Sequence, residues 1–183
     1  IFCTGQEDRL VRIFRAQKAY AQAAEVIRVT LIHVGDFRES YLREAQREYE
    51  KRLSAFCNFR CVCVKEEDTG DGSPAEIEKA LRKEGRHIEA LIPRRAYVYA
   101  LCVEGESCSS EAFAASGERA ANDAGELVFV IGSSHGLCDA VKRAADKRLS
   151  FSPMTLPHRL MRVVLTEQIY RAMTIMHHRA YHK

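Results

Sequence analysis

Four short apolar runs, separated by segments with helical spacing, constrain the fold of this chain more than any other feature. The runs are VIRVTLIHVG (26–35), FRCVCV (59–64), AYVYALCVEG (96–105) and ELVFVIG (126–132). Each is apolar along most of its length, which is typical of strands that are covered on both faces. The repeated order of strand and helix predicts an α/β fold with a parallel sheet and helices on both faces.

The strand pattern begins near residue 27 and continues to the end of the chain. A chain of 183 residues with 46% hydrophobic residues suits one ordinary globular domain. We therefore predict one domain over residues 27–183, preceded by an N-terminal extension of unknown role over residues 1–26. No stretch has the uninterrupted apolar length of a membrane span, and the start lacks the layout of a secretory signal, so a cytoplasmic location is expected.

The seven cysteines do not indicate a metal site or a disulfide framework. None of them form a C-x-x-C pair, and CNFRCVC (57–63) fits a strand with small apolar side chains better than a zinc site. The terminal HHRAYHK (177–183) holds three histidines, but Arg179 and Lys183 lie among them and would repel a cation. We expect no metal, and the tail suits phosphate better.

Positive charge is concentrated in the last part of the chain. Residues 142–183 carry a net charge of +7, while the whole chain carries +3 and the remainder therefore −4. This distribution favours a phosphate-rich partner such as RNA, with a solvated basic face as the simpler alternative.

Ligands of parallel α/β sheets bind outside the carboxyl ends of the strands, so the segments leaving the later strands are candidate sites. They are LCVEGE (101–106), IGSSHG (131–136) and FSPMTLPH (151–158). In the third segment Pro153 and Pro157 restrain the backbone, so its N–H and C=O groups can read a flat polar ligand. Adenine is such a ligand, and Leu101, Met154 and Leu156 supply apolar contacts to its ring.

The same segments carry a resemblance to the RlmH family of SPOUT-class methyltransferases, running from about Val29 to Lys183. The similar pieces are VTLIHVG, YEKRL, LCVEGE, SSE, FVIGSSHGL, the run LSFSPMTLPHRLMRVVLTEQIYRAMTIM and the terminal AYHK. Their order and spacing make the resemblance specific. It implies an enzyme that methylates N3 of a pseudouridine in large-subunit ribosomal RNA, on assembled ribosomes.

The resemblance also implies a cofactor, a topology and a set of contacts. The C-terminal segment would be threaded through a loop as a deep trefoil knot, with S-adenosylmethionine bound in the knot. The family usually has a second glycine where this chain has Ser133. The expected cofactor-binding residues are Leu101, Gly105, Gly132, Phe151, Ser152, Pro153, Met154, Thr155 and Leu156.

By the same resemblance, the last helix packs against its copy in a homodimer. The apolar residues expected to form that surface are Leu160, Val163, Val164, Ile169, Met173 and Ile175. A helix that is hydrophobic on nearly every side is also explained by burial within its own monomer, so this alternative stays open.

Transfer of a methyl group to the imide nitrogen requires loss of the N3 proton, by direct displacement without a covalent intermediate. The candidates for the general base are His158, Tyr181 and His182. Arg162, Arg179 and Lys183 are expected to bind RNA phosphate or the developing charge.

Two other function classes compete with this hypothesis. A non-catalytic RNA-binding module would use the same basic region without binding the cofactor. A dinucleotide-dependent oxidoreductase is disfavoured, because the first strand ends in VGDF (34–37) without a glycine-rich phosphate turn.

Overall fold

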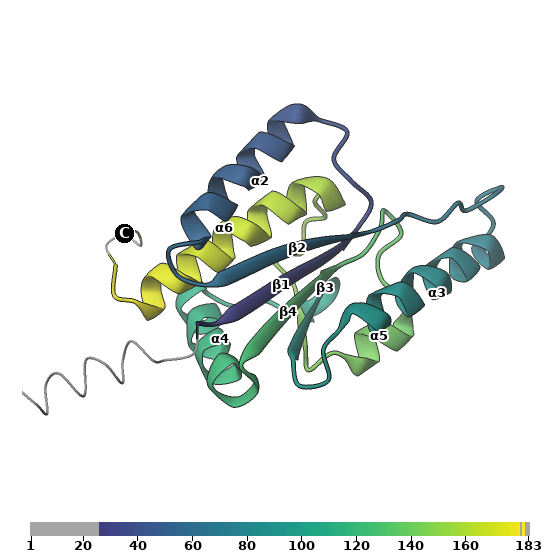
Figure 1. Cartoon of the computed structure of the whole chain (residues 1–183). Coiled ribbons are helices and arrows are strands. Elements are labelled where there is room, and N and C mark those ends of the chain that lie inside the picture. The colour runs from purple at the N-terminus through teal and green to yellow at the C-terminus, as the bar shows by residue number, and fades with distance from the viewer. Residues whose placement is uncertain (1–25, 180, 182–183) are drawn as a thin grey trace, which may run out of the picture.

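The structure, a computed structural model, describes residues 26–179 and 181 (Figure 1). All of the predicted N-terminal extension except Val26 therefore lies outside the described residues. The described elements are β1 (Arg28–Val34), α2 (Ser40–Leu53), β2 (Asn58–Val64), α3 (Pro74–Leu91), β3 (Tyr97–Glu106), α4 (Ser110–Ala124), β4 (Glu126–Ile131), α5 (Asp139–Ala144), β5 (Lys147–Leu149) and α6 (His158–Met176).

The strands form one parallel sheet with the order β2-β1-β4-β3-β5. The four predicted strands are confirmed. The short fifth strand was not predicted, because its sequence Lys147–Leu149 is mostly charged and only three residues long. It pairs with β3 at the sheet edge, where a register irregularity lies between Leu101 and Glu106.

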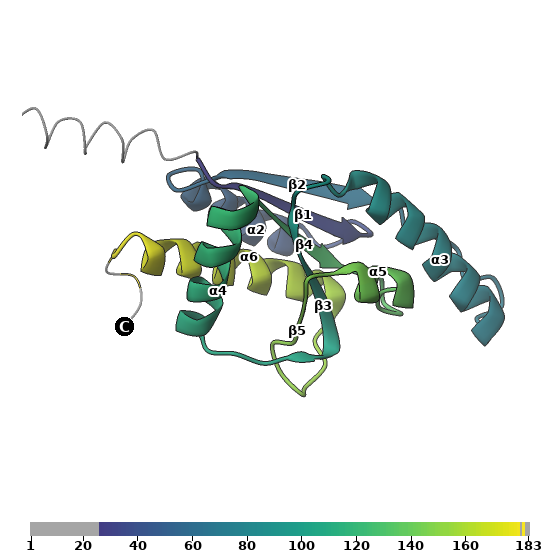
Figure 2. The same cartoon turned by 90° about the horizontal axis from the view of Figure 1, so that it is seen from below.

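The helices cover both faces of the sheet, as the alternation of strands and helices predicts. Helices α2, α4 and α6 lie together on one face, and α3 and α5 lie on the other (Figures 1 and 2). Among the helices that the structure describes, none has the length and apolar character needed to cross a membrane.

Helix α4 shows how local sequence sets an element's limits. The Ser109 side chain accepts a hydrogen bond from the Ala112 N–H, which satisfies one of the free donors of the first turn. Gly125 ends the helix with a φ of 72°, a left-handed conformation that glycine adopts without strain. Ser109 and Gly125 therefore set the two limits of this helix.

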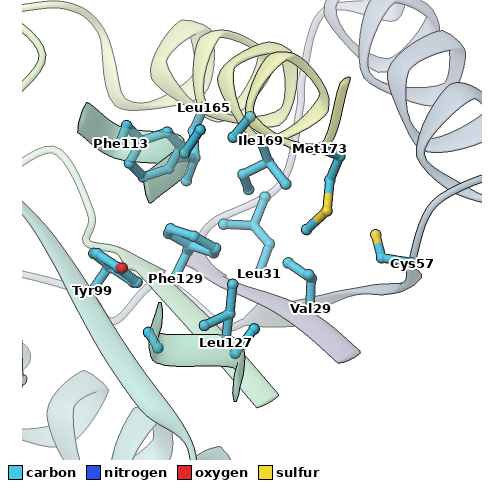
Figure 3. Close-up of a cluster of buried hydrophobic side chains, with 14 of the residues drawn as sticks. Val29, Leu31, Cys57, Tyr99, Phe113, Leu127, Phe129, Leu165, Ile169 and Met173 are labelled. Carbon is cyan, nitrogen blue, oxygen red and sulfur yellow. The ribbon is translucent and has the colours of Figure 1, made fainter. Parts of the chain in front are cut away.

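The larger hydrophobic core lies between the sheet and α6 (Figure 3). Leu165, Ile169 and Met173 of α6 meet Leu31 and Phe129 of the strands, and all of them are buried.

This packing corrects the expectation that Ile169 and Met173 belong to a dimer surface. They are 1% and 2% exposed because they fill the core of their own monomer. Leu160 remains 37% exposed, and Val163, Val164 and Ile175 are partly buried.

Candidate functional site

A cavity of about 570 Å³ opens at the edge of the sheet where the parallel strands end. Its walls come from three segments: residues 101–104 of β3, residues 131–137 after β4, and residues 149–158 after β5, with a few further side chains. A volume of this size is typical of a pocket for a small organic ligand. The three segments that the sequence selects as candidate sites therefore meet around one cavity.

Two glycines allow backbone segments to meet at the wall of this cavity. A Cβ on Gly132 would lie 2.0 Å from the carbonyl oxygen of Gly136, which no side chain tolerates. A Cβ on Gly105 would lie 2.6 Å from the carbonyl carbon of Leu149. Glycine at both positions is therefore a steric requirement of the fold around the cavity.

Hydrogen bonds of the chain itself hold the loop between β5 and α6. The Ser150 N–H donates to the Glu106 carbonyl at 3.0 Å, and the Ser152 hydroxyl accepts from the Met154 N–H at 3.0 Å. The N–H groups of Thr155 and Leu156 form no hydrogen bond with any described residue. Because both residues line the cavity, these donors are available for a ligand.

Most of the predicted cofactor-binding residues line the cavity. Gly105 and Pro153 do not: Gly105 supports the wall from behind, and Pro153 is an exposed residue of the loop. The predicted residues that line the cavity are Leu101, Gly132, Phe151, Ser152, Met154, Thr155 and Leu156.

Sequence reasoning missed several further wall residues. Leu137 and Met161 add apolar surface, and Lys142 donates to the Glu104 carboxylate at 2.7 Å. The segment LCVEGE (101–106) is the end of β3, which continues to Glu106, so the predicted strand AYVYALCVEG (96–105) itself reaches the cavity.

His158, a predicted general base, is the first residue of α6 and lines the cavity. Its Nε2 is buried and has no hydrogen-bond partner among the residues that the structure describes. Burial lowers the pKa of His158, and the charge of Arg159 lowers it further, whereas Glu66 raises it. Its imidazole is therefore neutral at neutral pH and able to accept a proton.

Arg162 does not lie on an open surface, in contrast to the role expected for it in RNA binding. It is 6% exposed and belongs to a buried polar cluster. Its guanidinium donates to the Gln46 side-chain oxygen, lies 2.9 Å from Nε2 of His33 and 3.5 Å from the Asp36 carboxylate. In the chain without RNA, the hydrogen-bonding groups of the Arg162 guanidinium are therefore already used by these partners.

His33 completes this cluster beneath the loop after β1. Its Nδ1 lies 2.7 Å from the Gly35 carbonyl oxygen, and the Arg162 guanidinium lies 2.8 Å from Nδ1 and 2.9 Å from Nε2. In the tautomer whose Nδ1–H donates to Gly35, Nε2 is the acceptor for Arg162. Burial, followed by the positive charge of Arg162, lowers the pKa of His33 to about 4. The neutral imidazole is the form that satisfies both contacts.

Tyr181 and Arg179, the described C-terminal candidates, do not line the cavity of their own chain. Tyr181 follows the end of α6, where its hydroxyl donates to the Glu167 carboxylate at 3.4 Å and its ring packs on Tyr170. Glu167 lies nine residues after His158, which is about 14 Å along α6. Arg179 is exposed, and His182 and Lys183 lie outside the described residues.

Acidic partners neutralise much of the positive charge of residues 142–183. Lys142, Lys147 and Arg159 form ion pairs with Glu104, Glu106 and Glu39 respectively.

Over residues 26–179 and 181, the exposed cations of this region without an ion pair are Arg143, Arg148 and Arg179. In the part of the chain that the structure describes, there is no cluster of three or more His, Cys, Asp or Glu that could hold a metal ion.

Comparison with known proteins agrees with the site. Residues 27–182 match the family described as "Predicted SPOUT methyltransferase". The chain is 45% identical over 157 residues to the ribosomal RNA large subunit methyltransferase H of Ligilactobacillus salivarius, covering 85% of this chain and 99% of that protein. It is 42% identical over 159 residues to the protein of the same name from Exiguobacterium sibiricum, covering 86% and 100%.

The fold has a counterpart among solved structures. A probable methyltransferase from Bordetella pertussis superposes with a TM-score of 0.52 at 20% sequence identity, covering 80% of this chain and 96% of that one. A probable methylase family protein from Haemophilus influenzae gives the same TM-score at 12% identity, covering 85% and 70%. At these identities the likeness concerns the fold alone.

Proposed function

Because the chain belongs to the SPOUT methyltransferase family, it is a methyltransferase, and we propose that it methylates N3 of a pseudouridine in large-subunit ribosomal RNA. The observation that carries the proposal is the match over residues 27–182 to a family whose named relatives act on that RNA. The cavity at the carboxyl edge of the sheet is where the reaction would take place.

The residues around the cavity fit S-adenosylmethionine as the methyl donor. Leu101, Met154 and Leu156 provide apolar contacts for an adenine ring, and the free N–H groups of Thr155 and Leu156 suit its nitrogen acceptors. Glycine at position 132 allows the close packing on Gly136 that shapes the turn forming this wall. When bound, the cofactor supplies an electrophilic methyl group.

The protein's part in the reaction is to align the imide nitrogen, exclude water and remove a proton. His158 is the candidate base within the described cavity, since its neutral imidazole lies in the wall with an unpartnered Nε2. Arg159 follows it on α6 and reaches the Asp36 carbonyl, so its charge lies at the same edge of the site.

A homodimer through α6 would bring the C-terminal candidates to a cavity. In one chain the Tyr181 hydroxyl contacts Glu167, which is nine residues and about 14 Å along α6 from His158, so we propose that Tyr181 serves the cavity of a neighbouring copy. His182 and Lys183 follow Tyr181 in the sequence and are proposed to act at the same place. The exposed side of Leu160 and the half-buried Val163 and Val164 supply apolar surface for such a contact. Each site of such a dimer would then combine His158 of one copy with the C-terminal residues of the other.

The proposed knot is supported by the way β5 lies against the end of β3. The Ser150 N–H donates to the Glu106 carbonyl, and the backbone of Gly105 packs against Leu149. From this edge of the sheet the chain returns to α6, which packs between α2 and α4 on the face of β1. We propose that this return passes through the loop between β3 and α4.

The proposed substrate is the assembled ribosome, and the cytoplasm is where the protein would meet it. The exposed cations Arg143, Arg148 and Arg179 are available for phosphate, whereas Arg162 is held by internal partners. Binding would therefore depend on exposed cations near the cavity and on those at the end of α6.

The test is transfer of labelled methyl from S-adenosylmethionine to purified ribosomes that lack the modification, with the product nucleoside identified by mass spectrometry. Methyl on N3 of a pseudouridine is the expected result, with free unmodified RNA as the comparison substrate. Binding of S-adenosylmethionine without methyl transfer to ribosomes would contradict the proposed substrate. RNA binding without cofactor binding would point to a non-catalytic module instead.

A further inference from the structure

The carboxyl group of Glu84 is buried in a part of the molecule that the proposed reaction does not use. Glu84 lies on α3 and is 2% exposed. One carboxyl oxygen, Oε1, accepts the Glu67 N–H at 3.0 Å. The other, Oε2, is buried and forms no hydrogen bond with any described residue. A buried carboxyl oxygen without a partner costs free energy, so its retention needs an explanation.

Glu84 lies between two loops that leave the carboxyl edge of the sheet. It lines a hollow of about 350 Å³ whose walls include residues 66–69 after β2 and residues 133–135 after β4. Residues 133–135 also line the larger cavity, so they form the partition between the two spaces. Glu84 is therefore behind the wall of the cofactor cavity.

That wall is a tight turn held by the backbone on its cavity side. The Gly136 N–H donates to the Ser133 carbonyl at 3.0 Å, and Gly132 packs directly on Gly136. Ser133 is 6% exposed and lines the same hollow as Glu84. Burial raises the pKa of the Glu84 carboxyl, while the Glu67 N–H and the Ser133 hydroxyl lower it. Ser133 thus links the turn to α3.

The same carboxyl group also holds the loop after β2. Through the Glu67 N–H it fixes the residue next to Glu66, whose carboxyl oxygen would lie 3.2 Å from a Cβ placed on Gly35. His158 Nε2 would lie 3.7 Å from the same point. Glu84 is therefore in contact with both loops that flank the cavity on this side.

We propose that Glu84 is a positioning residue for the methyl-donor site, holding the turn from Ser133 to Gly136 in place through the Ser133 hydroxyl. The inference rests on the proposed function, because it assigns the turn to a cofactor-binding wall. A serine at this position then has a specific use: it lines both spaces, so its hydroxyl is available to the Glu84 carboxyl behind the wall of the cavity.

The test is a double-mutant cycle read as the affinity for S-adenosylmethionine, measured by calorimetry on the full chain. The four proteins are wild type, Glu84→Ala, Ser133→Gly and the double variant. We expect Glu84→Ala to raise the Kd about tenfold when Ser133 is present and less than about threefold when glycine replaces it. The Glu84→Gln variant should restore the wild-type Kd, because the amide still accepts from Glu67 and donates to Ser133.

The melting temperature of each variant separates positioning from a general loss of stability. A merely structural role would lower the melting temperature and raise the Kd equally in both backgrounds. Glu78→Ala is the matched control, since Glu78 is an exposed carboxylate of α3 that forms an ion pair with Arg82. Glu84→Asp, which shortens the side chain and keeps its charge, replaces Glu84→Ala if that protein does not fold.

Each outcome supports or overturns the inference. An unchanged Kd in folded Glu84→Ala, or in Glu84→Asp where that variant stands in for it, overturns it, as does the same fold-change in both Ser133 backgrounds. If wild-type protein itself does not bind S-adenosylmethionine, the proposed function fails first, and the inference about this turn fails with it. Coupling between the two positions with recovery in Glu84→Gln supports the positioning role.

Discussion

The guanidinium carbon of Arg162 lies 3.3 Å from the centre of the Phe37 ring. Phe37 is 4% exposed, so the aromatic face covers one side of the cation while Gln46 and His33 bind its edge. This contact joins α6 to the loop after β1 and to α2. The loop that borders the site is thus attached to the helix that begins with His158.

Loss of this cation should destabilise the fold strongly. We expect Arg162→Ala to reduce the free energy of unfolding by about 3 kcal/mol, because His33 and Gln46 would be left buried without their partner. Urea denaturation measures the difference. Arg47→Ala, at an exposed position of α2, serves as the control and should change stability little. A loss no larger than that of the control would show that the cluster contributes little to stability.

Acid should destabilise the protein through His33. Its pKa is about 4 in the folded chain and 6.5 as an ordinary value, so between these values the unfolded chain binds a proton that the folded chain does not. This contribution is fully present above pH 6.5 and is lost as the pH falls toward 4, amounting to about 3 kcal/mol.

Urea titrations over that pH range test the assignment to His33. The His33→Gln variant should show a flatter dependence of unfolding free energy on pH. His87→Gln, at an exposed position of α3, should retain the wild-type slope. An unchanged slope in His33→Gln would assign the acid sensitivity to other groups.

A methyl group at position 132 should damage the methyl-donor site. The Cβ of Gly132→Ala would collide with the Gly136 carbonyl, so the turn must move, and we expect about tenfold weaker binding of S-adenosylmethionine. Gly117→Ala is the matched control: Gly117 lies in α4, and a Cβ there would be 3.8 Å from Leu127 Cδ1, an ordinary van der Waals contact. That variant should bind normally and unfold at a slightly higher temperature. Equal binding by both variants would exclude the turn from the site.

The pKa of His158 should respond to Glu66. Glu66 raises the pKa of His158, so Glu66→Gln should lower it further below 6.5. Proton NMR of the histidine ring measures the pKa, with His158→Asn used to identify the signal. Glu67→Gln is the control, because the Glu67 carboxylate pairs with Lys83 on α3. A pKa that stays constant or rises in Glu66→Gln contradicts the predicted contact.

Ribosome binding should weaken steeply as salt concentration rises. The double variant Arg143→Ala/Arg148→Ala removes two exposed cations, so the slope of log affinity against log salt should fall by about two. Arg82→Ala, which removes an arginine already paired with Glu78, should change the slope less. An affinity that stays flat over a tenfold rise in salt would contradict electrostatic binding.

The sheet was predictable because its strands are buried on both faces and therefore apolar along their length. That signal is absent from Lys147–Leu149, which is held as a strand by pairing with β3 and not by its own composition. The position of the cavity was also predictable, since parallel strands place their carboxyl ends at one edge. The family resemblance, and not residue spacing, supplied the cofactor.

The buried state of Arg162 was not predicted because an arginine in a basic segment is ordinarily expected to be exposed. A signal was present: Arg162, Leu165 and Ile169 follow the helical spacing of the buried side of α6. Its partners His33 and Gln46 are more than a hundred residues away in sequence. Their convergence depends on the packing of α6 against α2 and β1, which spacing within one segment does not reveal.

The walls of the cavity come from residues 101–104, 131–137 and 149–158, with Met161 beyond them. Strands β1 to β4 precede the last of these segments in the sequence, so during synthesis they leave the ribosome before it does. A partial chain that stops before residue 149 therefore holds most of the sheet but lacks one wall of the binding site. We expect such a fragment to bind the methyl donor poorly.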